Sequence, residues 1–229
     1  MFSLHGYGPS IFEGTILTLE VSLVSLFFAM VLGMAGALAK LSRSAVLRGL
    51  ATLYTTVIRG IPDLVLMLLV FFGGQVLVNR LGVVFGYDGY IDINPFIAGV
   101  LTIGFIFGAY MTETFRGAII AVNKGQLEAG YAYGMSSFQV FRRILFPQMV
   151  RHALPGFGNN WLVLVKTTAL VSIIGLDDMV RKASLAAGAT RMPFTFYVVV
   201  AINFLLITTV SIYLLKYLEG RYSTGVKRD

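Results

Sequence analysis

The chain has 229 residues, of which 57% are hydrophobic and only 13% are charged. Soluble domains have about 25% charged residues and at most about half apolar ones, so we expect this chain to be surrounded by lipid. It has no cysteine, which excludes disulfides, thiol catalysis and cysteine-based metal sites. Two histidines are too few for a zinc site. The net charge of +7 fits loop charges that orient a membrane protein better than it fits a nucleic-acid surface.

Five apolar segments are long enough to cross a bilayer, which requires about 20 mostly apolar residues. Each segment is continuous, without the alternation of a half-buried strand, so the pattern predicts helices. In chain order they are residues 14–39, 57–78, 95–114, 156–176 and 193–215. The first residues lack the basic region of a cleavable signal peptide, so we expect the first segment to remain as a span. The sequence thus predicts an all-α integral membrane protein with one transmembrane domain over residues 1–229.

Two connections contain recognisable local signals. The run from Arg59 to Asp63 reads RGIPD, and it predicts a helix break followed by a restart, because Pro62 and Asp63 suit the first turn of a helix. Residues 44–58 before this break could form an interfacial helix that leads into the second span. Residues 172–193 contain acids and a run of small residues, and we expect part of this stretch to be helical at the outer surface.

Basic residues are concentrated in the connections on one side of the predicted membrane. That side holds Lys40, Arg43, Arg48, Arg59, Arg116, Lys124, Arg142, Arg143, Arg151, Lys216, Arg221, Lys227 and Arg228. The other side holds only Arg80, Arg181, Lys182 and Arg191. Because lysine and arginine accumulate on the cytoplasmic side, an odd number of spans places the amino terminus outside and the carboxyl terminus in the cytoplasm.

A polar island at residues 126–147, QLEAGYAYGMSSFQVFRRILFP, interrupts the apolar segments on the cytoplasmic side. We predict a short helix, a glycine break at Gly134, a second amphipathic helix and a stop at Pro147. A connection that merely joins two spans does not need two helical pieces. The island therefore looks suited to being held by something outside the membrane, although an amphipathic loop on the membrane surface is the simpler alternative.

Two acids lie within or near apolar segments, where ionisable groups are expensive and often functional. For Glu20 we favour a position at the outer interface without a specific role. Glu113 lies near the inner end of the third segment. It is explained equally well by a pair with Arg116, three residues further on, and by an acid that faces an aqueous path and favours a cationic substrate. The two explanations are compatible.

The fourth segment carries a polar stripe around Lys166, which is placed near the centre of this predicted span. The stripe includes Asn160, Thr167 and Thr168, and such residues line a cavity or a helix interface rather than face lipid. We interpret Lys166 as a charge that faces the substrate path and attracts a carboxylate; the alternative is a buried partner for an acid on another helix.

Small and acidic residues elsewhere carry weaker signals. Gly104 and Gly108 form a GxxxG spacing that permits close helix approach. Asp177 and Asp178 are interpreted as helix caps or surface charge, since no ligand cluster accompanies them. No phosphate-binding glycine loop is present in the sequence, so if ATP drives transport, another subunit must bind it.

With these residues in view, the island resembles the EAA loop of permease subunits of ABC importers. The pattern of that loop falls on Glu128, Ala129, Gly130, Gly134, Ile144, Phe146 and Pro147. Gly130 replaces the third alanine and Phe146 replaces a leucine, while the spacing is intact. Further stretches, among them GAYMTETFRGA and KTTALVSIIGLDD, resemble polar amino-acid permeases along nearly the whole chain, most closely the Q-type subunits of the histidine and lysine-arginine-ornithine group.

The resemblance implies a type I importer permease core in the bacterial inner membrane, with the island as a cytoplasmic coupling helix. It implies a homologous M-type permease subunit, two cytoplasmic ATPase subunits that hold ATP and Mg²⁺, and a periplasmic amino-acid-binding protein. The chain itself would hold no cofactor and catalyse no reaction. Two other classes remain open from the residues alone: a stand-alone ion-coupled transporter or channel, although no internal repeat is seen, and a membrane scaffold.

Overall fold

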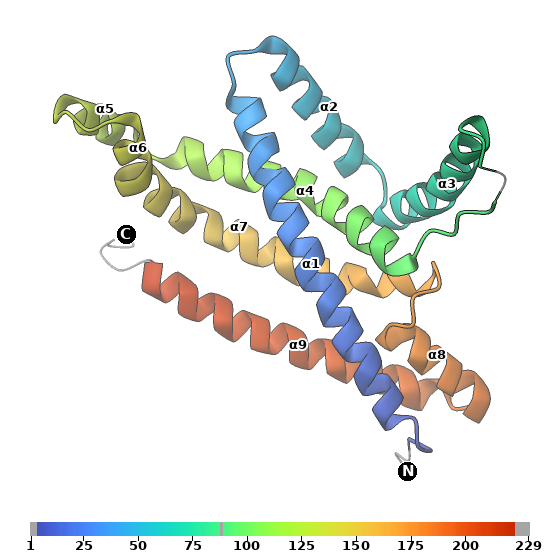
Figure 1. Ribbon diagram of the computed structural model, residues 1–229. Coiled ribbons are helices and arrows are strands. Elements are labelled where there is room, and N and C mark those ends of the chain that lie inside the picture. The colour runs from blue at the N-terminus through green and yellow to red at the C-terminus, as the bar shows by residue number, and fades with distance from the viewer. Residues whose placement is uncertain (1–3, 88, 223–229) are drawn as a thin grey trace.

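The computed structural model describes residues 4–87 and 89–222, and every regular element within those ranges is a helix. The basic residues Lys227 and Arg228 of the predicted tail lie outside them. Long helices cross one another at the centre, and a small helical subdomain projects from one end (Figure 1). In chain order the elements are α1 (Gly8–Leu41), α2 (Ala45–Gly60), α3 (Asp63–Val84), α4 (Pro95–Ala121), α5 (Lys124–Ala132), α6 (Ser137–Val140), η1 (Phe141–Leu145), α7 (Phe146–Thr167), η2 (Thr168–Ser172), α8 (Met179–Thr190) and α9 (Pro193–Tyr222).

The core forms where α1 packs along α4. Gly104 and Gly108 of the predicted GxxxG pair lie in this contact, and a Cβ at Gly104 would come within 2.8 Å of Phe28 Cβ on α1. A Cβ at Gly108 would come within 2.9 Å of Leu32 Cβ. The predicted close approach of helices is therefore present, and it makes α4 the most buried of the long apolar helices.

The second predicted span is divided. The helix α2 ends at Gly60, Ile61 and Pro62 are extended, and α3 begins at Asp63, so the predicted break and restart are both found. The observed α3 continues to Val84, beyond the predicted end at residue 78. Side chains of Gln75 and Asn79 on α3 bind the backbone of the following loop at Ile91 and Ile93, which fixes the return to α4.

The fourth predicted span is displaced along the sequence. The helix α7 starts at Phe146, ten residues before the predicted start at residue 156, and gives way to the 3₁₀ turn η2 after Thr167. Hydropathy did not reveal this early start because the first turns carry Arg151, His152 and Pro155. As a consequence, Lys166 lies in the last turn of α7 and not near the centre of a span.

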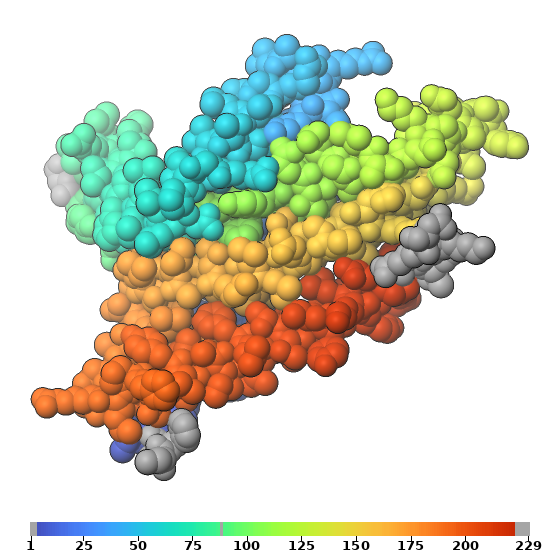
Figure 2. Space-filling view, turned by 180° about the vertical axis from the view of Figure 1, so that it is seen from behind, coloured from blue at the N-terminus to red at the C-terminus, as the bar shows by residue number. Residues whose placement is uncertain are grey.

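Four helices within the described ranges are long and apolar enough to cross a membrane: α1, α3, α4 and α9. The helix α7 is not among them, so five spans are a proposal and not an observation. The predicted helical part of residues 172–193 is α8, which packs against α1 and α9. The start of α1 and the end of α9 lie at opposite ends of the molecule (Figure 1), and α7 and α9 run side by side (Figure 2).

Candidate functional site

The polar island folds into two helical pieces joined by a tight turn. The first piece is α5, whose N-cap Asn123 accepts a hydrogen bond from the backbone N–H of Gly125 at 2.8 Å. The turn contains Gly134 at φ +78°, a left-handed conformation that favours glycine, and this matches the predicted break. The second piece starts with a capping box, in which Ser136 and Gln139 each accept from the other's backbone N–H.

The residues of the EAA pattern divide into an inner and an outer set. Gly130 is buried, and a Cβ there would lie 2.7 Å from Cδ1 of Ile144 and 3.2 Å from Cγ2 of Val140, so these residues hold the two pieces together. Glu128 and Ala129 are exposed on α5, and no hydrogen bond or ion pair to Glu128 exists within the described residues. The geometry thus leaves the Glu128 carboxylate available to a partner.

The predicted stop at Pro147 is wrong. Pro147 lies in the first turn of α7, and the chain remains helical from Ser137 to Thr167 through the π-helical segment η1. Proline has no N–H to donate, and its ring crowds the preceding turn. The wider turn of η1 accommodates the missing hydrogen bond and the proline ring: the N–H of Phe146 donates to the carbonyl of Phe141, five residues earlier.

Glu113 is neutralised within the chain. Its Oε2 accepts two hydrogen bonds from Arg116, at 3.0 Å from Nε and 2.8 Å from Nη2, which is the predicted pair. Its Oε1 contacts Nζ of Lys40 at the end of α1. The Glu113 side chain is 22% exposed, so the carboxylate is shielded but not sealed. Two cations around one carboxylate leave this site with a net positive charge. The sequence predicts the pair with Arg116 but not the contact with Lys40.

The polar stripe of α7 is used mainly for packing. Asn160 is buried and donates to Oγ1 of Thr114 on α4 at 3.0 Å, so it joins the two helices. The hydroxyls of Thr167 and Thr168 are buried and bind carbonyls of their own helical segment. Lys166 is exposed, and no partner for its ammonium group lies within residues 4–87 and 89–222. Of the predicted path residues, therefore, Lys166 is the one that presents a free charge to the surroundings.

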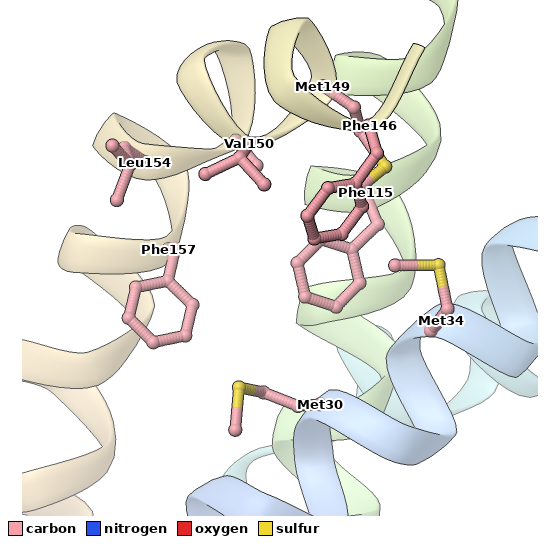
Figure 3. Close-up of a pocket in the computed structure, with 9 residues that line it drawn as sticks. Met30, Met34, Phe115, Phe146, Met149, Val150, Leu154 and Phe157 are labelled. Atoms are coloured by element: carbon pink, nitrogen blue, oxygen red, sulfur yellow. The ribbon is translucent and has the colours of Figure 1, made fainter. Parts of the chain in front are cut away.

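An apolar cleft of about 310 Å³ lies where the island joins the long helices. Figure 3 shows Met30 and Met34 of α1 facing Phe115 of α4 and the first turns of α7. The cleft is lined by Met30, Met34, Phe115, Phe146, Met149, Val150, Ala153, Leu154 and Phe157. Methionine side chains adapt readily to changes in shape, so this is a place where α7 can shift against α1 without losing contact.

The break between α2 and α3 brings together polar groups that sequence reasoning had assigned to other roles. The charge pattern predicts a loop charge at Arg59, yet its guanidinium lies 5.4 Å from the ring centre of Tyr110 on α4. Asp63, interpreted as a dipole partner, begins α3 close by. The signal that could have identified this site is a proline break flanked by opposite charges inside an apolar region, since interrupted membrane helices commonly bind substrate.

The chain is similar to known membrane transport proteins. The family described as binding-protein-dependent transport system inner membrane component matches residues 29–224. The chain is 51% identical over 225 residues to the histidine/lysine/arginine/ornithine transport system permease protein HisQ of Escherichia coli (strain K12), covering 98% of both chains. It is 43% identical to the octopine transport system permease protein OccQ of Rhizobium meliloti, covering 99% of this chain and 96% of the relative.

Two solved structures share the fold. A crystal structure of an amino acid ABC transporter with histidines has a TM-score of 0.79 and 32% identity, covering 94% of this chain and 95% of its own. The MetNI methionine ABC transporter in an inward-facing conformation has a TM-score of 0.64 and 19% identity over 95% and 96% of the two chains, which supports the fold alone. The chain therefore belongs to the family of binding-protein-dependent transport system inner membrane components.

Proposed function

We propose that this permease is the Q-type subunit of an importer for basic amino acids, with histidine, lysine, arginine, ornithine or an opine as the substrate class. The observation that carries the proposal is the 51% identity to HisQ over 98% of the chain. The octopine transport system permease protein OccQ is 43% identical to this chain, and this supports extending the substrate class to opines. The comparisons give no support to a stand-alone ion-coupled transporter.

The island at residues 126–147 is proposed to be the coupling helix that docks on the ATPase. Support comes from the exposed Glu128 and Ala129 on α5 and from the packing of Gly130 against Ile144, which presents them on a fixed surface. Gly134 permits the turn, and Pro147 marks the entry into α7. When two ATPase subunits close around ATP, the coupling helices of both permease subunits would move together and the helices would open outward.

The remaining architecture follows from that role. The chain would pair with a homologous M-type permease, and a periplasmic binding protein would deliver the amino acid. ATP and Mg²⁺ would be bound and hydrolysed in the ATPase subunits, and this chain would be non-catalytic. The fifth crossing would be α7, with the amino terminus in the periplasm and the carboxyl terminus in the cytoplasm of a bacterium. The end of α9 lies at the same end of the molecule as α5 and α6, in agreement with this orientation (Figure 1).

Several charged groups are proposed to line the substrate path. Lys166 is exposed and unpaired within the described residues, so it suits a carboxylate. Arg59 and Asp63 at the helix break offer both charges that an amino acid requires. Glu113 is less available to a cationic side chain than the sequence suggested, because Lys40 and Arg116 compensate it. Asn160, Thr167 and Thr168 would support the path by fixing α7 against its neighbours.

Substrate class is tested by ATPase stimulation in the reconstituted complex. The binding protein would be supplied loaded with histidine, arginine, glutamine or an opine, and each ligand compared at saturation. We expect histidine, arginine or the opine to stimulate hydrolysis well above the rate with unliganded binding protein. Stimulation by glutamine alone would contradict the basic-amino-acid assignment while leaving the importer assignment intact.

Coupling is tested by Glu128→Arg. Reversal of the exposed acidic charge of α5 should abolish substrate-stimulated ATP hydrolysis and weaken co-purification of the ATPase. The matched control is Glu219→Arg near the end of α9, which makes the same change of charge outside the island. Equal uptake by both variants and the wild type would rule out a coupling role for Glu128.

A further inference from the structure

A second cleft, unrelated to the island, opens where the end of α1 meets α2 and α4. Its volume is about 530 Å³. It is lined by Lys40, Ala45, Arg48, Gly49, Thr52 and Arg116. Half of these residues are basic, and none is acidic, which distinguishes this cleft from the apolar one in Figure 3.

The cations of this cleft are held in place but not fully neutralised. Lys40 and Arg116 share the Glu113 carboxylate. Arg48 donates from Nη1 to the carbonyls of Ser42 and Arg43, at 2.9 Å each, and these contacts carry no neutralising charge. Three cations against one carboxylate leave a formal excess of two positive charges. The cleft is therefore arranged for an anion.

The cleft is also open. Ala45 and Gly49 contribute little side chain to its wall, and a Cβ built on Gly49 would meet no atom within 4 Å. Within the described residues, the hydroxyl of Thr52 has no hydrogen-bond partner, so it can donate to a ligand oxygen. An anion with several oxygens, such as a phosphate, fits two guanidinium groups, an ammonium group and this hydroxyl better than a single-atom ion does.

The surroundings show what such an anion is attached to. On α2 the face that carries Arg48 lies beside an apolar face whose side chains are strongly exposed: Val46 is 70% exposed, and Leu50 and Leu53 are each 61% exposed. Lys40 lies in the last turn of α1, a candidate membrane span, which puts the cleft at headgroup depth. Basic pockets between helices at a membrane face bind anionic headgroups.

We propose that this cleft binds the phosphate of an anionic phospholipid, with its acyl chains along the apolar face of α2. The lipid would bridge α1, α2 and α4 where α2 begins. This site goes beyond the transport function and does not depend on the identity of the transported amino acid.

The test uses the full chain purified with its partner subunits and stripped of lipid. The complex is titrated with phosphatidylglycerol or with phosphatidylcholine that has the same acyl chains. Native mass spectrometry counts the bound lipid. Phosphatidylglycerol should bind at least about tenfold more tightly. Arg48→Gln should weaken it about fivefold, which corresponds to ~1 kcal/mol for one basic side chain near a membrane surface. Gly49→Leu keeps every cation but places a bulky side chain in the cleft, and it should weaken binding at least as much.

The control is Arg80→Gln, which removes one positive charge near the end of α3, away from this cleft, and should leave phosphatidylglycerol binding unchanged. Equal binding of the two lipids, or full retention in both Arg48→Gln and Gly49→Leu, overturns the proposal. Inorganic phosphate that competes with the same affinity as the lipid would show a simple anion site and overturn the lipid assignment. Loss of the ATPase from Arg48→Gln with lipid binding intact would show a protein-docking surface instead.

Discussion

At the scale of single residues, Glu113 is the charged group that links α1 to α4. It ties Lys40 of α1 to α4 and holds Arg116 on its own helix. A half-buried carboxylate with two cationic partners differs from an exposed pair, because removal of the acid leaves two positive charges close together with little water between them.

We therefore predict that Glu113→Gln lowers the stability of the purified complex by about 1–3 kcal/mol. This loss is smaller than the loss expected on breaking a fully buried ion pair, because Arg116 is partly exposed. The measurement is thermal unfolding in lipid nanodiscs. Glu13→Gln is the control: it breaks the pair with Lys182, where the acid is 69% exposed, and it should change the melting temperature little. Equal losses from the two variants would show that burial of Glu113 adds nothing.

Asp178 is a buried acid outside the candidate membrane spans. Its Oδ1 caps α8 by accepting from the N–H of Arg181 at 3.0 Å, while its Oδ2 is buried without a partner. Burial raises the pKa of Asp178 from 3.8 to about 6, against the opposing effect of backbone hydrogen bonds from Arg181 and Val180. The predicted capping role is found, and the buried, unsatisfied oxygen makes ionisation of this carboxyl harder in the fold than in the unfolded chain.

Because the folded pKa is raised, the stabilising contribution of Asp178 is complete below about pH 4 and is lost as the pH rises through 6. The full change is about 3 kcal/mol. Asp178→Asn keeps an oxygen to cap α8 but cannot ionise. We predict a melting temperature that depends less on pH between 5 and 7.5 than in the wild type, with the variant more stable at pH 7.5. Parallel profiles for the two proteins would refute this prediction.

At the scale of elements, the contact between α1 and α4 depends on the absence of side chains. A methyl group at Gly104 would lie within 2.8 Å of Phe28 Cβ, whereas one at Gly117 on the same helix would meet nothing within 4 Å. We predict that Gly104→Ala destabilises the complex by about 1–3 kcal/mol through overpacking. Gly117→Ala should be neutral or slightly stabilising, since alanine is the better helix former. Denaturation in mild detergent compares the two, and equal stabilities would contradict the role of close packing.

The sequence was most informative where local chemistry determines local structure. Gly134 needs a left-handed backbone, Pro62 and Asp63 start a helix, and Gly104 and Gly108 permit contact, and all of these could be inferred without coordinates. Pro147 misled because a proline both ends helices and begins them. The choice depends on whether the preceding turn can widen, as η1 does, and no residue pattern reveals that in advance.

Pairings between distant segments could not be predicted from the sequence. Lys40 and Glu113 are 73 residues apart, and Asn160 and Thr114 are 46 apart, so hydropathy has no means of joining them. The same limit explains α7: Asn160 is buried through its contact with Thr114 of α4, while a window average counts this residue only as unfavourable for a span.

At the scale of the whole molecule, burial is uneven. In the most apolar stretch of each helix, 67% of residues are buried in α4, but only 11% in α3 and 6% in α9. Apolar helices this exposed require either lipid or another protein along most of their length. The outer helices thus offer surfaces for the bilayer and for the proposed M-type partner, and the chain alone is only part of the assembly.

The proposed orientation can be tested directly because the sequence has no cysteine, so any maleimide label on this chain marks an introduced residue. We predict that a membrane-impermeant maleimide labels Gly6→Cys in cells whose outer membrane alone is permeable. Gly125→Cys at the start of α5 should be labelled only after the inner membrane is opened. The reverse pattern would place the island outside and exclude docking on a cytoplasmic ATPase.

The run of helix from Ser137 to Thr167 contains the π-helical segment η1 and Pro155, yet the backbone stays helical throughout and connects the island to Lys166. Thirty or so residues at about 1.5 Å each give a path roughly 45 Å long along the helix axis. If an outside force tilts one end of this helix by about 5° while the angle at Pro155 is unchanged, the far end moves by at most roughly 4 Å. Lys166 lies at that far end. A small rotation at the surface could therefore move this ammonium group into or out of reach of a bound carboxylate, with no change in the fold between the two ends.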